Sequence, residues 1–135
     1  MSDWNTEIIE EFRANDGAVG GPFEGRPLLL LHHTGARTGT TRVSPLMYQS
    51  VGDDFAVFAS KGGADTNPDW FHNLKANPEA TIEVDGESVD VMARVVGGKE
   101  RDEIWEQQKS DYPQFADYEE KTARDQIPVV VLHPV

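Results

Sequence analysis

Two tight turns, each between a pair of strand-like segments, constrain the fold of this chain most strongly. Gly52-Asp53-Asp54 separates Arg42–Val51 from Phe55–Ser60, and Asp85-Gly86 separates Thr81–Val84 from Ser88–Val96. Turns this short join antiparallel neighbours, whereas parallel strands need a crossover of about a dozen residues. The helical segments are too few for such crossovers, so we expect an antiparallel barrel or a strongly curled sheet.

Short apolar segments near both ends complete the expected sheet of about six strands. Pro27–His33 is an apolar run closed by a turn, which is typical of a buried strand. Ile127–His133 has the same character and predicts a closing strand. Pro45 lies inside Arg42–Val51 and lacks a backbone N–H, so we expect an edge or a bulge there.

Helical patterns lie before and between these strands. They run from Trp4 to about Asn15, from Asp69 to Lys75, from Lys99 to about Ser110 and onward from Pro113. Asp16–Gly25 is a Gly-rich loop. For the second helix we expect Asn67 as the cap, Pro68 at the first position and Asn77-Pro78 as the stop.

Composition predicts one domain over residues 1–135, in which residues 1–25 are the N-terminal amphipathic helix and loop. The chain has no cysteine, which excludes disulfides, thiolate nucleophiles and Cys-ligated metals. A net charge of −12 argues against duplex nucleic acid, and the acidic face of the first helix disfavours an anionic membrane surface. No segment has the pattern of a signal peptide or a membrane-spanning helix, so we expect a cytoplasmic protein; its oligomeric state stays open.

One segment reverses the acidic balance of the chain. The whole chain has 24 acids against 12 Lys and Arg, yet residues 25–52 contain no Asp or Glu. This window includes the turn Thr34–Thr40 (TGARTGT), whose glycines and hydroxyls can present backbone N–H groups and side-chain donors to an anion. A strongly acidic protein needs a locally positive site to hold an anion, so we expect an anionic ligand here.

A second group of residues is expected near this turn. A strand ends in Ser60–Gly63, and the helix that follows carries Trp70 and Asn73. The helix start at Asp69 offers N–H groups, Lys61 offers a positive charge and Trp70 offers a flat apolar wall. Together these groups could hold a planar ring with a phosphate tail. Trp70 considered alone is more readily a core aromatic, but Lys61 and Asn73 beside it favour the site.

Other chemistries have weaker support. His32 and His33 are adjacent and point to opposite faces of a strand, and no two histidines have a chelating spacing, so we expect no metal site. Ser44 and Ser60 lack the GxSxG context of a catalytic triad. The turn TGARTGT lacks the GK[ST] ending of a Walker A loop.

Three stretches carry a family resemblance: LLLLHHTGARTGTTRVSPLMY, FAVFASKGGADTNPDWFHNLKANPEATIEV and YPQFADYEEKTARDQIPVVVL. Over roughly Pro27–Val135 the chain resembles the deazaflavin-dependent nitroreductases, also called F420-dependent quinone reductases, and the block SKGG…NPDWFHNLKANP is the most specific part. The resemblance implies an α+β fold, a single-domain split β-barrel with flanking helices. It also implies coenzyme F420, an 8-hydroxy-5-deazaflavin with a phosphodiester and an oligoglutamate tail.

The resemblance also implies site residues. The cofactor would be held by Ala36, Arg37 and Thr38 at the phosphate; by Arg42, Val43, Ser44, Pro45, Leu46 and Met47 beside the ring; by Phe58, Ala59, Ser60 and Lys61 at the ring edge; and by Asp69, Trp70, Phe71, His72 and Asn73. Tyr112, Phe115 and Tyr118 would share one helical face and close over the reactive carbon. The implied catalytic hydroxyls are those of Ser60, Tyr112 and Tyr118. Phe115 replaces the phenol of the nitro-drug-activating member, so reduction of nitro-drugs is not implied.

The implied reaction is hydride transfer from reduced F420 to a quinone, an enone or a nitro-aromatic acceptor. Two alternatives stay open from the residues alone. A similar barrel can hold FMN, because a phosphate turn does not distinguish the two rings. A non-enzymatic carrier of the deazaflavin, or of an apolar ligand, would need the turn but no acceptor site.

Overall fold

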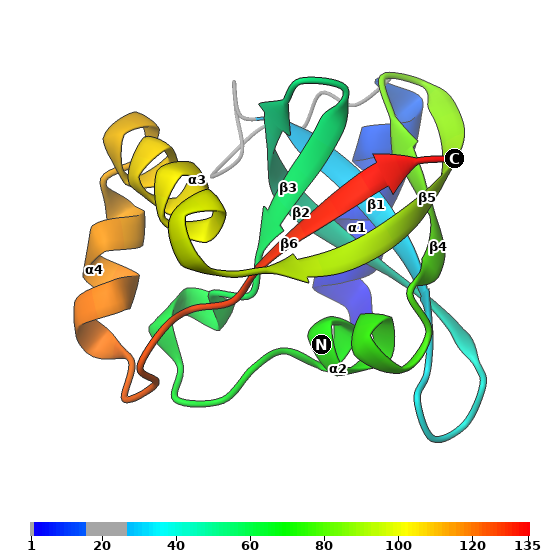
Figure 1. Cartoon of the computed structure of the whole chain (residues 1–135). Coiled ribbons are helices and arrows are strands. Elements are labelled where there is room, and N and C mark those ends of the chain that lie inside the picture. The colour runs from blue at the N-terminus through cyan, green and yellow to red at the C-terminus, as the bar shows by residue number, and fades with distance from the viewer. Residues whose placement is uncertain (1, 16–26) are drawn as a thin grey trace.

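In a computed structural model the chain is described over residues 2–15 and 27–135, with only the backbone described for residues 2–6 and Gly62. The strands are β1 (Leu28–Thr34), β2 (Thr41–Val51), β3 (Asp54–Phe58), β4 (Glu79–Val84), β5 (Glu87–Val96) and β6 (Val129–Pro134). They form a closed antiparallel barrel in the order β1-β2-β3-β6-β5-β4, with β4 paired to β1 (Figure 1). The expected antiparallel barrel is confirmed.

Helices cover the barrel on three sides (Figure 1). They are α1 (Ser2–Ala14), α2 (Asp69–Ala76), α3 (Gly98–Asp111) and α4 (Gln114–Lys121), with a short 3₁₀ turn, η2 (Lys61–Gly63), after β3. Trp70, Phe71 and Leu74 of α2 belong to the barrel core, so α2 closes one end of the barrel. α3 and α4 pack over the outer face of β3 and β6, and α1 packs over that of β1.

The apolar run of β1 is buried on both faces, which explains why it does not alternate with polar residues. Leu29 and Leu31 point into the barrel, whereas Leu28 and Leu30 pack outside with Ile8 and Phe12 of α1. β6 follows the same rule, with Val130 inside the barrel and Val129 under the helices. A strand between a barrel interior and a covering helix needs apolar residues at every position.

Pro45 lies where β2 is paired on one side. Over the described residues β2 pairs with β1 from Thr41 to Met47 and with β3 only from Tyr48 to Val51. The expected edge at Pro45 is therefore confirmed, and the missing N–H is tolerated at an edge.

Three local expectations were wrong. The third strand ends at Phe58 rather than Ser60, and the closing strand begins at Val129. Pro68, not Asn67, precedes the first helical residue of α2, and no described side chain caps that helix. The Asn67 amide oxygen instead accepts a hydrogen bond from Arg124 at 2.6 Å. The loop expected at Asp16–Gly25 lies outside the described residues.

None of the helices, over the part of the chain that the structure describes, combines the length and apolar character needed to cross a bilayer.

Candidate functional site

The turn between β1 and β2 meets the start of α2 at one end of the barrel (Figure 1). Together they line a pocket of about 510 Å³, made by Gly35, Ala36, Arg37, Thr38, Arg42, Asp69, His72 and Asn73. All of these residues except Gly35 were expected to hold the cofactor. The sequence segments are far apart, and the barrel topology brings them together.

The turn has a fixed shape that depends on two glycines. The Gly35 N–H donates to the Thr40 carbonyl at 2.8 Å, and the Gly39 N–H donates to the Gly35 carbonyl at 2.9 Å. Gly39 has φ +70°, which an L side chain rarely adopts. A Cβ on Gly35 would lie 2.8 Å from the Thr38 hydroxyl. Within the described residues, the backbone N–H groups of Arg37 and Thr38 have no hydrogen-bond acceptor, so they are available to a ligand.

The pocket carries two guanidinium groups that pair with no described acid. Arg37 and Arg42 are exposed and form no salt bridge with any described residue. The Asp69 carboxylate, in the first turn of α2, interacts favourably with the helix dipole, but it repels an anion at that wall of the pocket. An anion in this pocket is therefore held best on the side of the turn and the two arginines.

A buried hydrogen-bond chain lies behind the turn. The Ala36 N–H donates to Asn73 Oδ1 at 2.9 Å, and Asn73 Nδ2 lies 2.9 Å from His33 Nδ1. His33 Nε2 lies 2.9 Å from the Ser44 hydroxyl. Burial, and secondly the charge of Arg42, lower the pKa of His33 to about 4. From the sequence alone His33 is expected to be an ordinary strand residue, because its partners Ser44 and Asn73 lie elsewhere in the chain.

A second connection that the sequence did not reveal runs through Arg124. Its guanidinium donates to the carbonyls of Ala59 and Ser60, each at 2.8 Å, and to the Asn67 side chain. Arg124 therefore fixes both ends of the loop between β3 and α2. The Lys61 ammonium, in the middle of this loop, donates to the Thr66 hydroxyl at 3.2 Å and is not part of the pocket lining.

The six β2 residues expected beside the ring, residues 42–47 (the β2 strip), are divided between the two faces of the strand. Arg42, Ser44 and Leu46 pair with the residues of β1 that point inward, and Leu46 packs against the barrel core. Val43 and Met47 pack on the outer face beneath α1, and Pro45 has the same parity in β2. A ring lying on either face would meet alternate side chains of the strip rather than all of them.

The aromatic residues expected beside the ring are mostly buried. Trp70 is 7% exposed and lies edge-on to Phe71, with both rings in the barrel core. Phe58 and Ala59 are buried as well. Stacking on a ligand requires an open ring face, and little of the Trp70 surface is open. Contact between Trp70 and the cofactor therefore stays a prediction.

The residues expected to close over the reactive carbon do not share one helix. Tyr112 follows the end of α3, whereas Phe115 and Tyr118 lie in α4 with ring centroids 5.2 Å apart. Phe115 is 4% exposed and packs against Phe58. Tyr112 lines a second pocket of about 610 Å³ between β2 and α3. The Tyr118 hydroxyl accepts a hydrogen bond from Gln114 at 3.2 Å.

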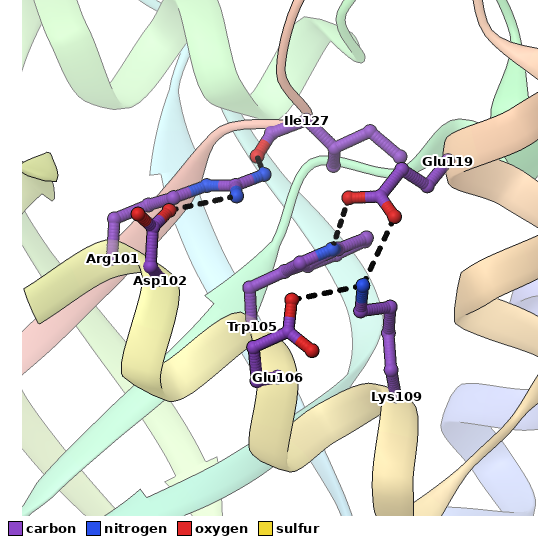
Figure 2. Close-up of polar contacts among 7 residues, drawn as sticks. All are labelled: Arg101, Asp102, Trp105, Glu106, Lys109, Glu119 and Ile127. Carbon is purple, nitrogen blue, oxygen red and sulfur yellow. Dashed lines mark hydrogen bonds and ion pairs between the residues drawn. The ribbon is translucent and has the colours of Figure 1, made fainter. Parts of the chain in front are cut away.

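Polar contacts attach α4 to α3 (Figure 2). The indole N–H of Trp105 donates to Glu119 at 2.6 Å, and Lys109 donates to the other oxygen of the same carboxylate at 3.0 Å. The Arg101 guanidinium lies over the Trp105 ring and donates to the Ile127 carbonyl at 2.8 Å. Glu119 thus links the helix carrying Tyr118 to α3, alongside the packing of Phe115 against Trp105.

Several known proteins are similar to this chain in sequence and in fold. A sequence profile of the family described as F420H(2)-dependent quinone reductase matches residues 4–134. An F420H(2)-dependent quinone reductase of Mycobacterium tuberculosis is 38% identical over 125 residues, covering 90% of this chain and 83% of the relative. A solved F420-H2 dependent reductase has a TM-score of 0.72 and 38% identity, covering 80% of this chain and 95% of its own. A solved domain-swapped dimer has a TM-score of 0.74 and 34% identity, covering 98% of both chains.

Proposed function

The chain belongs to the F420H(2)-dependent quinone reductase family, and on this basis we propose that it transfers a hydride from reduced coenzyme F420 to a quinone-type acceptor. The chemistry of the pocket fits the phosphodiester of that cofactor. Two arginines without a described ion-pair partner and two backbone N–H groups without a described acceptor line a space of about 510 Å³. This pocket is the observation that carries the proposal, because such donors hold phosphate oxygens well.

Each part of the chain has a separate task in the proposed reaction. Ala36, Arg37, Thr38 and Arg42 hold the phosphate end, and the β2 strip and the loop after β3 lie along the ring. The bound cofactor supplies the hydride. A quinone that receives a hydride and one proton becomes a hydroquinone, so the protein must also support negative charge on the acceptor oxygen.

Hydroxyl groups near α4 are the proposed donors to that oxygen. Because Gln114 already donates to the Tyr118 oxygen, the Tyr118 proton is left to point toward another acceptor. Tyr112 lines the pocket between β2 and α3, and the backbone carbonyl of Ser60 is fixed by Arg124. We assign catalysis to these three hydroxyls. Phe115 packs behind Tyr118 and supports the wall of the site.

Side-by-side binding measurements test the cofactor class. The protein is titrated with reduced and oxidised F420, with FMN and with NADPH, using absorbance and calorimetry. We expect tight, saturable binding of F420 and weak or no binding of the other two. Preference for FMN would favour the alternative flavin reductase and would contradict the proposal.

A further inference from the structure

The hydrogen-bond chain behind the turn determines where the protons lie. Asn73 Oδ1 accepts from a backbone N–H, that of Ala36, so the orientation of the amide is fixed. The other end of the amide, Nδ2, can only donate, and it faces His33 Nδ1. Nδ1 must therefore be the acceptor. The His33 proton then lies on Nε2, which donates to the Ser44 hydroxyl.

This arrangement requires a neutral imidazole, and the surroundings favour one. His33 is 3% exposed, which disfavours the charged form. Among the charged and titratable groups that face it, Arg42 from β2 and His32 from β1 also disfavour the imidazolium, whereas Asp69 from α2 favours it. A protonated Nδ1 would turn one donor toward another and break the bond to Asn73.

The hydrogen-bond chain ends at Ala36, in the part of the turn that a ligand would touch. Ala36 lines the pocket, and the next two residues carry the N–H groups that have no described acceptor. Holding the Ala36 N–H in place therefore orients the N–H groups of Arg37 and Thr38. We propose that His33, as its neutral Nε2–H tautomer, is a positioning residue that holds the anion-binding turn through Asn73. This assignment rests on the proposed function only for the identity of the anion.

Measurements on the ligand-free protein test this hydrogen-bond chain directly. Long-range nitrogen–proton NMR of the imidazoles should show His33 as the Nε2–H tautomer from pH 8 to pH 5, without titration. The Ala36 amide should exchange slowly with solvent, and exchange should accelerate about tenfold or more in His33→Leu. A His33 signal of the Nδ1–H tautomer, or titration near pH 6.5, would overturn the proposal.

Binding measurements then separate positioning from general structural damage. In His33→Leu we expect affinity for intact F420 to fall roughly 5- to 30-fold, with a much smaller change for a deazaflavin lacking the phosphate tail. His33→Asn can still accept from Asn73 and should recover most of the affinity. His32→Asn is the matched control, because His32 faces the other side of β1 and bonds to Glu83.

Three outcomes distinguish the possibilities. Equal losses for the two ligands, or no recovery in His33→Asn, would contradict the positioning role. Failure of the wild-type protein to bind F420 would contradict the proposed function. The His33 tautomer and the Ala36 exchange rate would still show whether His33 holds the turn. If His33→Leu does not fold, the wild-type tautomer and the His33→Asn comparison remain decisive.

Discussion

Single residues determine how strongly the pocket can hold an anion. Arg37 and Arg42 are the cationic side chains in its lining, and Asp69 opposes them. Each arginine can form a charge-assisted hydrogen bond without first breaking an ion pair to a described residue. Arg37 and Arg42 should therefore contribute more to anion binding than Lys61, whose ammonium already donates to the Thr66 hydroxyl.

Arg42→Ala should weaken F420 binding by about 1.5 to 3 kcal/mol, the usual contribution of a hydrogen bond to a charged group. Calorimetry with the intact cofactor measures the loss. Arg94→Ala is the control, because Arg94 is an exposed arginine that pairs with Glu100 away from the pocket. Equal affinities for the wild-type and Arg42→Ala proteins would mean that the phosphate lies elsewhere.

His33 should give the stability of the protein a specific pH dependence. Its pKa is about 4 in the folded protein, where burial is the main cause, against 6.5 in an unfolded chain. On acidification the unfolded chain takes up the proton first, so stability present above pH 6.5 is lost as the pH falls. Between pH 7.5 and pH 5 this loss should be roughly 2 kcal/mol.

Urea unfolding of the wild-type and His33→Asn proteins across this range measures the effect. Their difference in the free energy of unfolding should shrink on acidification, because the variant lacks the titrating group. Parallel curves would show that His33 does not titrate as the buried environment predicts.

At the scale of secondary-structure elements, one carboxylate joins α4 to α3. Glu119 accepts from the buried indole of Trp105 and from Lys109, and these bonds attach α4 to α3. α4 in turn contacts η2, where a Cβ on Gly63 would lie 3.0 Å from the Tyr118 Cα. The position of α4 thus affects both the Tyr118 hydroxyl and the loop after β3.

Glu119→Ala should lower the free energy of unfolding by about 1 to 3 kcal/mol, because the buried Trp105 N–H loses its acceptor. Urea unfolding followed by circular dichroism measures this. Glu106→Ala is a matched control: Glu106 is also an exposed carboxylate that pairs with Lys109, but it accepts no bond from the buried Trp105 indole, so its loss should cost about 0.5 kcal/mol or less. Similar effects in the two variants would rule out a special role for Glu119.

The whole molecule combines a strongly acidic chain with one positive pocket. With a net charge of −12, long-range forces oppose an anionic cofactor, but they are screened beyond about 8 Å at physiological salt. Contacts with Arg37 and Arg42 act at much shorter range. Local attraction should therefore dominate binding.

Added salt should weaken the binding of intact F420 more than the binding of a deazaflavin without the phosphate tail. Dissociation constants for both ligands, measured from low to high salt, provide the comparison. The tail-less ligand is the internal control for effects of salt on the ring site. Equal salt dependence would show that the basic turn does not hold the phosphate.

The sequence predicted those features of the molecule that depend on local signals. Hairpin turns and apolar segments were enough to predict the strands and the antiparallel barrel, and the acid-free window indicated most of the pocket lining. Expectations failed where a distant partner decides the outcome. Asn67 does not cap α2 because Arg124, far along the chain, takes its side chain. His33 was missed for the same reason, and the burial of Trp70 depends on how α2 meets the barrel.

Single-turnover oxidation of bound reduced F420 by menadione distinguishes a quinone reductase from a carrier of the cofactor. The protein is loaded with reduced cofactor, mixed with the quinone in a stopped-flow instrument, and followed by the absorbance of oxidised F420. We predict saturable oxidation far faster than in free solution, slowed in Tyr118→Phe and in Arg42→Ala at limiting cofactor. Oxidation no faster than that of the free cofactor would mean that the protein is a carrier and not a quinone reductase.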